Sequence, residues 1–287
     1  MRRITVAHSP DADDIFMYYA LKFGWVSDKG FYFSNEALDI QTLNERACEG
    51  IYDVSAISFA LYPYIRDSYA LLRTGVSFGE GYGPKLIKKR GKHLKRNFKV
   101  ALSGRYTSNA LLFSLAYPDA RIVYKNFLEI ESAVLSGEVD AGVLIHESIL
   151  HFDDSLEVER EVWDIWLELA RESLPLPLGG MGIRRSIPLH AAIEIESLLT
   201  RAVELARQHP TLLSKMLHER ALLRVCGEEL ERYLSLYAND HSISLSEEQL
   251  RALDVLFALG YERGLYSERI EASECLIPKE YAELRKS

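Results

Sequence analysis

GEVDAGVL at residues 137–144 repeats, in a second part of the chain, the pattern of GIYDVSAI at residues 50–57. Each stretch opens with a glycine that ends a predicted helix, because glycine readily adopts the left-handed backbone found just after a helix. An aspartate holds the fourth position of both stretches, and an apolar run typical of a buried strand follows. A unit that recurs within one chain indicates repeated structure. We therefore predict two α/β lobes of similar construction.

The sequence around these stretches alternates strand-like and helical segments. Strands are predicted at residues 4–8, 32–38, 54–58, 69–73, 98–102, 122–124 and 141–145, and helices at residues 14–23, 42–49, 107–116 and 130–135. Such alternation is typical of parallel α/β units. VAHS at residues 6–9 also resembles VALS at residues 100–103, although two short matches can arise by chance in an α/β protein. If two lobes face each other, the carboxyl ends of their strands line a shared cleft, where open α/β sheets bind ligands.

The last third of the chain has a different character. Amphipathic helices are predicted at residues 190–209, 211–224, 227–239 and 246–264, and we expect them to pack on the first lobe without forming a site. The first lobe is then predicted to comprise residues 1–90 and 181–287, and the second lobe residues 91–180. The basic segment at residues 85–96 and the LPLPLGG segment at residues 174–180 are expected to connect the lobes. The second segment is predicted to be extended, since a residue before proline disfavours helix.

Composition argues against several classes of protein. The formal net charge of −8 argues against a general nucleic-acid-binding protein, which needs a basic surface, and fits a protein that binds a small molecule. No apolar stretch approaches the ~18 residues of a membrane span. Arg2 and Arg3 precede an acidic run instead of the apolar segment of a signal peptide, so we expect a cytoplasmic protein. Cys48, Cys226 and Cys275 form no CxxC pair, which fits a reducing compartment.

Four predicted turns carry polar side chains to the carboxyl ends of strands. They are SPDADD at residues 9–14, SAIS at residues 55–58, SGRYTS at residues 103–108 and IHES at residues 145–148. The first turn contributes Ser9 and Asp14 to the proposed cleft. Its three aspartates can act as paired acids, but an acidic helix start explains them more simply.

The turn at residues 103–108 opens a predicted helix, which makes it a candidate anion site. Free N–H groups and the helix dipole favour an anion there, Thr107 and Ser108 add hydroxyl groups, and Arg105 adds a positive charge. The alternative is that Thr107 serves only as the N-cap of the helix.

His146 follows a continuous apolar strand, which can hold its ring rigidly against a ligand and suits a general base. A histidine that is only hydrogen-bonded at a strand end is the alternative. The spacing between His146 and His151 is five residues and not the four of a zinc-binding HExxH helix, so we expect no metal site here. Glu147 is the nearest neighbour to orient the ring, but it points to the opposite face if the strand continues.

Together these motifs resemble the 1,4-dihydroxy-6-naphthoate synthase family of the futalosine route to menaquinone. The matching residues are SP at residues 9–10, Asp14 and Phe16, TLN at residues 42–44, Ser58 with Ala60 and Tyr62, Arg66 and Asp67, GEGYGP at residues 79–84, Gly104 and Arg105 with Thr107, GEVDAG at residues 137–142, IHES at residues 145–148 and LPLPLG at residues 174–179. The match extends over residues 1–185, and the GEVxAGxxIHES and LPLPLG blocks are its most specific parts. The helical tail is much less diagnostic.

The resemblance implies the type II periplasmic-binding-protein fold and a lyase that converts cyclic dehypoxanthine futalosine, an anionic small molecule, to 1,4-dihydroxy-6-naphthoate and dihydroxyacetone. It implies His146 as the catalytic base, substrate-binding turns at Ala56, Ile57, Ser58, Thr107 and Ser108, and no metal or organic cofactor. Alternatives of the same fold are chorismate dehydratase and a non-catalytic solute-binding protein. The oligomeric state is not indicated by the sequence.

The chain departs from the family pattern in three places. The family commonly has Cys-Pro-Asn where Asp11, Ala12 and Asp13 stand, an apolar residue where His8 stands, and often a second threonine where Ser108 stands. The change at residues 11–13 alters one wall of the expected cleft.

Overall fold

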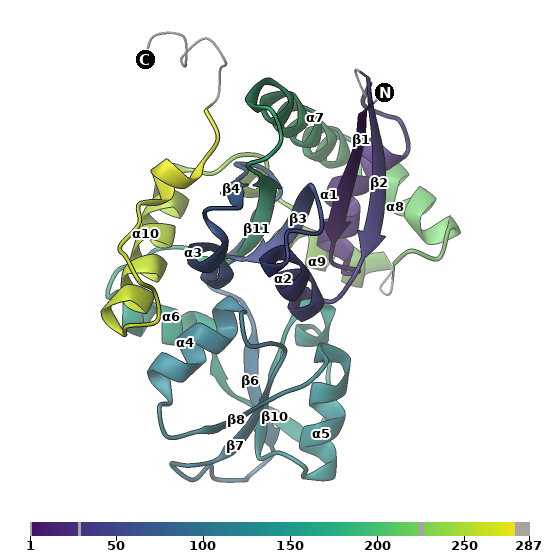
Figure 1. Ribbon diagram of the computed structural model, residues 1–287. Coiled ribbons are helices and arrows are strands. Elements are labelled where there is room, and N and C mark those ends of the chain that lie inside the picture. Colours follow the sequence, from purple (N-terminus) through teal and green to yellow (C-terminus); the bar gives the residue numbers. More distant parts are fainter. Residues whose placement is uncertain (1, 28–29, 224–226, 279–287) are drawn as a thin grey trace.

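The architecture is described from a computed structural model, which covers residues 2–27, 30–223 and 227–278 of the chain. Two β-sheets, each flanked by helices, lie one above the other in Figure 1. Cys226, one of the three cysteines noted above, lies outside the described residues.

The first sheet has the strand order β2-β1-β3-β11-β4, and β5 also pairs with β11. Its strands are β1 (Arg2–His8), β2 (Phe31–Ala37), β3 (Val54–Ser58), β4 (Tyr69–Leu71), β5 (Ser77–Gly79) and β11 (Leu176–Arg184). Strand β1 runs parallel to both β2 and β3, whereas β11 runs antiparallel to β3.

The second sheet has the strand order β10-β6-β9-β7-β8. Its strands are β6 (Lys85–Lys89), β7 (Lys99–Leu102), β8 (Arg121–Tyr124), β9 (Ala141–Leu144) and β10 (Leu156–Glu161). Strand β7 runs parallel to β8 and β9, and β6 runs antiparallel to β9.

The two sheets are therefore built on one plan, and the predicted likeness of the lobes is confirmed. In each, a central strand lies between two parallel neighbours, and one of these pairs with an antiparallel strand from a distant part of the chain. The repeated aspartate has the same role twice. Asp53 Oδ2 accepts the N–H of Thr5 in β1 at 2.9 Å, and Asp140 Oδ2 accepts the N–H of Lys99 in β7 at 2.8 Å. Each satisfies a backbone N–H of the neighbouring parallel strand.

The two crossings between the sheets lie earlier in the chain than the sequence predicted. Residues 85–89 form β6 of the second sheet, so this part of the basic segment is a strand and not a connector. Leu86 and Ile87 are fully buried, while Lys88 pairs with Glu159 of β10 at 2.5 Å, and acidic partners on a neighbouring strand explain the run of lysines. Strand β11 likewise belongs to the first sheet from Leu176 onward, before the predicted boundary at residue 181.

Helices cover the sheets and carry the site. They are α1 (Ala12–Lys22), α2 (Ile40–Cys48), α3 (Tyr62–Ile65), α4 (Ser108–Ala116), α5 (Ile130–Ser136) and α6 (Val162–Ala170). The C-terminal helices are α7 (Leu189–Gln208), α8 (Pro210–Glu219), α9 (Gly227–Tyr237) and α10 (Glu247–Glu262). Helices α7, α8 and α9 contact α1 on the first lobe, whereas α10 contacts both β11 and α6 and so lies against both lobes (Figure 1). Within the described residues, no helix has the length and apolar character needed to cross a membrane.

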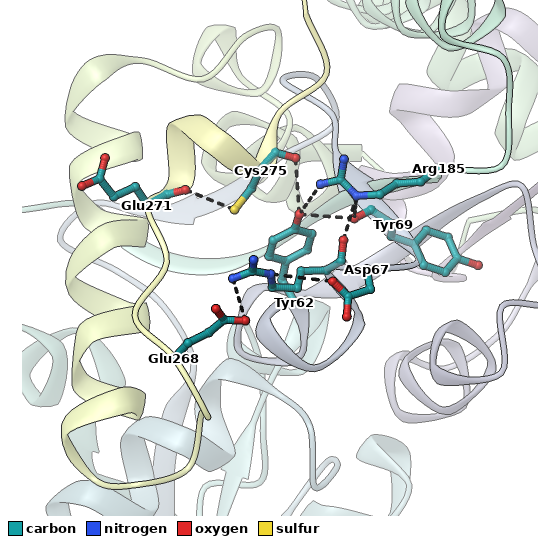
Figure 2. A network of polar contacts seen from close by, with 8 residues as sticks. Tyr62, Asp67, Tyr69, Arg185, Glu268, Glu271 and Cys275 are labelled. Carbon is teal, nitrogen blue, oxygen red and sulfur yellow. Dashed lines mark hydrogen bonds and ion pairs between the residues drawn. The ribbon is translucent and has the colours of Figure 1, made fainter.

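The C-terminal segment is tied to the first lobe around the buried side chain of Tyr62 (Figure 2). The carbonyl oxygens of Tyr69 and Cys275 lie 3.2 and 3.3 Å from the Tyr62 hydroxyl. Arg66 forms an ion pair with Glu268 at 3.0 Å. Two residues that matched the family pattern, Tyr62 and Arg66, therefore join distant segments of the fold.

Candidate active site

A cavity of about 710 Å³, its open mouth included, lies where the strands of the two sheets end. Its lining comes from both lobes and from α9: Ser9, Asp11, Asp13, Asp14, Ile40, Ala56, Ile57, Ser58, Gly75, Ser77, Pro84, Ser103, Thr107, Ser108, Asn109, Ile145, His146, Leu178, Gly179, Gly180, Tyr233 and Tyr237. All four predicted turns contribute to it. They meet because β1, β3, β7 and β9 are parallel within their sheets and end at facing edges.

His146 lies directly after β9, where the chain leaves the sheet and begins a short 3₁₀ helix at residues His146–Ile149. Its backbone has φ 55°, in the left-handed region that residues other than glycine rarely adopt. Such strain persists only where the surroundings enforce it, and it is common at functional sites. The ring packs edge-on against Phe127 with centroids 4.9 Å apart. The imidazole is therefore held by the backbone and by an aromatic neighbour.

The nearest polar partner of this ring is Asp11, which follows β1 in the first lobe. His146 Nδ1 is in direct contact with Asp11 Oδ2, and both side chains are largely buried, at 16% and 4% exposure. His146 Nε2 and Asp11 Oδ1 have no hydrogen-bond partner among the residues that the structure describes. Both residues line the cavity, and because a buried polar atom without a partner is costly, the pair favours a ligand at this place.

The two groups determine each other's protonation. Burial opposes a charge on His146, but the Asp11 carboxylate outweighs it, so the pKa of His146 lies above its usual 6.5. Burial by itself would raise the pKa of Asp11, and the charge and hydrogen bond of His146 lower it below 3.8. The pair is thus an ion pair over a range of pH in the ligand-free protein.

Glu147 makes a contact with the first lobe. The strand ends before His146, so the strand alternation that was expected to turn Glu147 to the opposite face does not apply. Glu147 Oε1 accepts the N–H of Ala12, in the first turn of α1, at 2.8 Å. A carboxylate from the second lobe thereby caps a helix of the first lobe. Burial, followed by the charge of Asp11, raises the pKa of Glu147.

Asp13 and Asp14 complete a cluster of acids beside the pair. Burial first, and then the charges of Asp11 and other neighbouring acids, raises the pKa of Asp13 well above its usual value, and the Tyr233 hydroxyl donates to Asp13 Oδ1 at 3.1 Å. Burial followed by Asp11 raises the pKa of Asp14 to about 7, although Asp14 Oδ2 accepts the N–H of Ser9 at 2.7 Å. Protons held by these carboxyl groups lower the negative charge that an anionic ligand meets.

The amino end of α4 provides a partial positive charge, in contrast to the cluster of acids. Thr107 is the N-cap, and its hydroxyl accepts the N–H of Ala110 at 3.2 Å, so the simple capping role is confirmed. Ser108 is also engaged, since its hydroxyl donates to the Leu178 carbonyl at 2.7 Å and accepts the Ala60 N–H at 3.3 Å. The hydroxyl groups of Thr107 and Ser108 thus already have protein partners.

Two neighbouring side chains have polar atoms without a partner: a serine hydroxyl, which can donate to an anion, and an amide oxygen, which can only accept. Ser103 Oγ and Asn109 Oδ1 are buried without a hydrogen-bond partner in the described part of the chain, and both residues line the cavity. Ser103 directly follows β7, and Asn109 lies in the first turn of α4, where backbone N–H groups and the helix dipole favour an anion. A buried polar atom without a partner is costly, which favours a bound ligand here.

Ser58 forms the remaining wall with Ala56 and Ile57 at the end of β3. Asn44 of α2 holds it in place, since Asn44 Nδ2 donates to Ser58 Oγ at 3.0 Å and Asn44 Oδ1 accepts the Ser58 N–H at 2.9 Å. The wall is therefore rigid. Because the polar groups of Ser58 already have partners, this wall contacts a ligand mainly through its shape.

Arg105 is the one predicted site residue that the structure places elsewhere. It lies on a separate groove, with its guanidinium 5.6 Å from the centre of the Tyr106 ring. The expected positive charge for the anion is therefore not supplied by Arg105, which lines the separate groove, whereas Thr107 lines the cavity.

The sequence also missed contributors to the cavity. Tyr233 and Tyr237 reach it from α9, although the C-terminal helices were expected to form no site. The helical spacing of these tyrosines is that of a core face, and only their packing beside α1 reveals a second role. Asp11 was present in the first turn, but no local signal distinguished it from its acidic neighbours.

Comparison with known proteins places this chain in a family. A family model for menaquinone biosynthesis matches residues 4–262. The chain belongs to the menaquinone biosynthesis family. The 1,4-dihydroxy-6-naphthoate synthase of Thermus thermophilus is 31% identical over 265 residues, which are 92% of this chain and 96% of that protein. The enzyme of the same name from Streptomyces coelicolor is 29% identical, over 91% of this chain and 94% of that protein. The resemblance seen in the motifs is confirmed.

Solved structures confirm the fold of this member of the menaquinone biosynthesis family. A protein of Archaeoglobus fulgidus has a TM-score of 0.84 and 36% identity, over 92% of this chain and 98% of that one. The alkanesulfonate-binding protein of Xanthomonas axonopodis, solved with MOPS bound, has a TM-score of 0.70 and 13% identity, over 96% of this chain and 98% of that one. At that identity the second likeness concerns the fold alone, which is that of periplasmic binding proteins, as expected.

Proposed function

We propose that the protein is a lyase that converts cyclic dehypoxanthine futalosine to 1,4-dihydroxy-6-naphthoate with release of dihydroxyacetone. The kinship with two synthases of that name supports the reaction. The observation that carries the proposal in this chain is His146 Nε2, buried in the cavity lining without a partner among the described residues.

In this mechanism His146 is the general base. When its ring is neutral and Nδ1 donates to Asp11, the lone pair lies on Nε2, in position to take a proton from the bound carbocycle. Loss of that proton begins the fragmentation that releases the three-carbon unit. The proton then on Nε2 is available to the departing fragment.

The substrate carboxylate is proposed to bind at the start of α4, near Ser103 and Asn109. The unpartnered Ser103 hydroxyl, which can donate a hydrogen bond, and the helix dipole support this placement. The acids around Asp11 disfavour a carboxylate on their side of the cavity. The cytoplasmic location and the absence of nucleic-acid or membrane partners remain predictions.

One assay tests the proposal. The purified protein is incubated with cyclic dehypoxanthine futalosine and, separately, with chorismate, and products are identified by mass spectrometry. We expect 1,4-dihydroxy-6-naphthoate and dihydroxyacetone in equal amounts from the first, and no dehydration of chorismate. Turnover of chorismate alone would assign the protein to the dehydratase of the same pathway. Binding without turnover of either compound would identify a solute-binding protein.

A further inference from the structure

We propose that Asp11 is a positioning residue for the base: its carboxylate, from the first lobe, holds the His146 ring of the second lobe with Nε2 directed at the substrate. This inference rests on the proposed function, because it assigns His146 the role of base. Asp11 itself acts through His146 and not on the substrate.

The first argument is that Asp11 does not do what its position predicts. It is the N-cap residue of α1, yet within the described chain its side chain makes no capping bond. The first turn of α1 is satisfied instead by Glu147, which accepts the Ala12 N–H across the cleft. An aspartate at an N-cap usually accepts a bond from its own helix, which stabilises the helix. Here the carboxylate is turned to His146 instead.

The second argument is the geometry of the ring. A carboxylate accepts only, so the His146 nitrogen that contacts it, Nδ1, must carry the proton. In the neutral ring the lone pair is then on Nε2, the atom that has no partner in the described residues. The wrong tautomer would place N–H at the substrate and remove the base. The same logic governs carboxylate–histidine pairs in other enzymes.

The third argument concerns the other groups around the ring. Phe127 packs against it edge-on and supplies no charge. Glu147 and Asp14 add weaker negative charge, but Glu147 is committed to Ala12 and Asp14 to Ser9. Asp11 is therefore the acid in direct contact with the ring, and it has a dominant effect on the ring's proton affinity among the neighbouring acids.

The decisive measurement needs no substrate. Histidine ¹⁵N signals of the full-length protein are followed from pH 5 to 9, with His146 identified by the loss of its signals in His146→Asn. We expect His146 to titrate above 6.5 and, when neutral, to carry its proton on Nδ1. In Asp11→Asn, which keeps the shape but loses the charge, we expect the titration to move to lower pH. A wild-type His146 that titrates at or below 6.5, or is protonated on Nε2 when neutral, would overturn the inference without any variant.

The matched control is Asp140→Asn. The Asp140 carboxylate accepts the backbone N–H of Lys99 and forms an ion pair with Lys92. It is a suitable control because it lies at the other end of β9 from His146. We expect this variant to leave the His146 titration unchanged. If Asp140→Asn shifts it as much as Asp11→Asn does, the effect is a general one of net charge and the inference is wrong.

Kinetics then connect the contact to turnover. We expect Asp11→Asn to lower kcat by ~10²-fold or more with little change in KM, as for other carboxylate–histidine pairs. The pH at which kcat/KM rises should move down with the His146 titration, and Asp11→Glu should restore part of kcat. An unchanged pH profile would refute the positioning role. If the wild type turns over no futalosine derivative, the proposed function fails, while the titration still tests the contact.

Discussion

The Asp11 carboxylate and the His146 imidazole are in contact although they leave different sheets, Asp11 after β1 and His146 after β9. The proposed base and its partner therefore come from opposite sides of the cavity. Their contact depends on the relative position of the two lobes, as does the bond from Ala12 to Glu147. Catalysis in this protein is consequently expected to be sensitive to contacts between the two lobes, such as the one between Ala12 and Glu147.

Replacement of the base should separate binding from chemistry. We expect His146→Asn to fold, to bind substrate with similar affinity and to lose turnover by ~10²–10⁴-fold, the usual contribution of general-base catalysis. His151→Asn is the control, because His151 is an exposed histidine close by in the sequence. Single-turnover kinetics and calorimetric binding check the two quantities. Near wild-type turnover in His146→Asn would move the role to another group, with Asp14 or Ser58 next to be tested.

A negative charge at the amino end of α4 should repel the substrate carboxylate. Asn109→Asp keeps the side-chain shape and places a negative charge at the amino end of the helix, where the dipole offsets part of the cost of burying that charge. We expect KM to rise by ~10–100-fold, the worth of a hydrogen bond to a charged group. Asn97→Asp, an equal change of charge at an exposed position before β7, should leave KM unchanged. An unaffected KM in Asn109→Asp would place the carboxylate elsewhere.

Asp14 should make the stability of the protein depend on pH. Its pKa is raised from 3.8 to about 7, so the folded state binds this proton more tightly than the unfolded state. The free energy of unfolding should therefore fall as pH rises from 4 to 7. Asp14→Asn should remove that part of the decline, as measured by urea denaturation across this range. Asp67→Asn changes a fully exposed acid and should keep the wild-type dependence of the unfolding free energy on pH. If Asp14→Asn shows the same dependence as the wild type, the assigned titration of Asp14 is wrong.

The contact between the two lobes should weaken when a hydrogen bond across the cleft is removed. Glu147→Ala leaves the Ala12 N–H without its partner, and a charge-assisted bond of this kind contributes about 1.5–3 kcal/mol. The contact of Ser108 with Leu178 remains. We expect the ligand-free variant to have a larger radius of gyration by small-angle scattering, and substrate to restore the wild-type value. Glu138→Ala, which removes an exposed ion pair with Lys125, should scatter like the wild type.

The parts of the site that the sequence predicted are those set by local chemistry. The apolar runs before Ser9, Ser58, Ser103 and His146 each specify a strand, and the polar residue at the end of each run must lie at the edge of a sheet. The repeat around Asp53 and Asp140 predicted two similar lobes because each copy specifies the same local unit, a helix end followed by a strand. Strand, turn and helix signals extend over a few residues and need no information from the rest of the chain.

Contacts between distant residues were not predictable in this way. The antiparallel strands β6 and β11 take their places through partners far away in the chain. The lysines of β6 have the composition of a solvated connector, and only the pairing with β10 shows that Lys88 lies opposite Glu157 and forms an ion pair with Glu159. Tyr233 had the spacing of a core residue, and its contact with Asp13 follows from the packing of α9 beside α1.

The sequence by itself determined the α/β class, the two-lobed plan, the family and the histidine at the end of β9, since each is written in short-range periodicity or in a contiguous motif. The tertiary structure decided which of three neighbouring aspartates contacts that histidine. Asp11, Asp13 and Asp14 have the same chemistry, and their burial and partners differ only because the second lobe lies opposite Asp11. In a low-dielectric cleft, the direction of one side chain determines whether a carboxyl group is an ion-pair partner or a protonated neighbour.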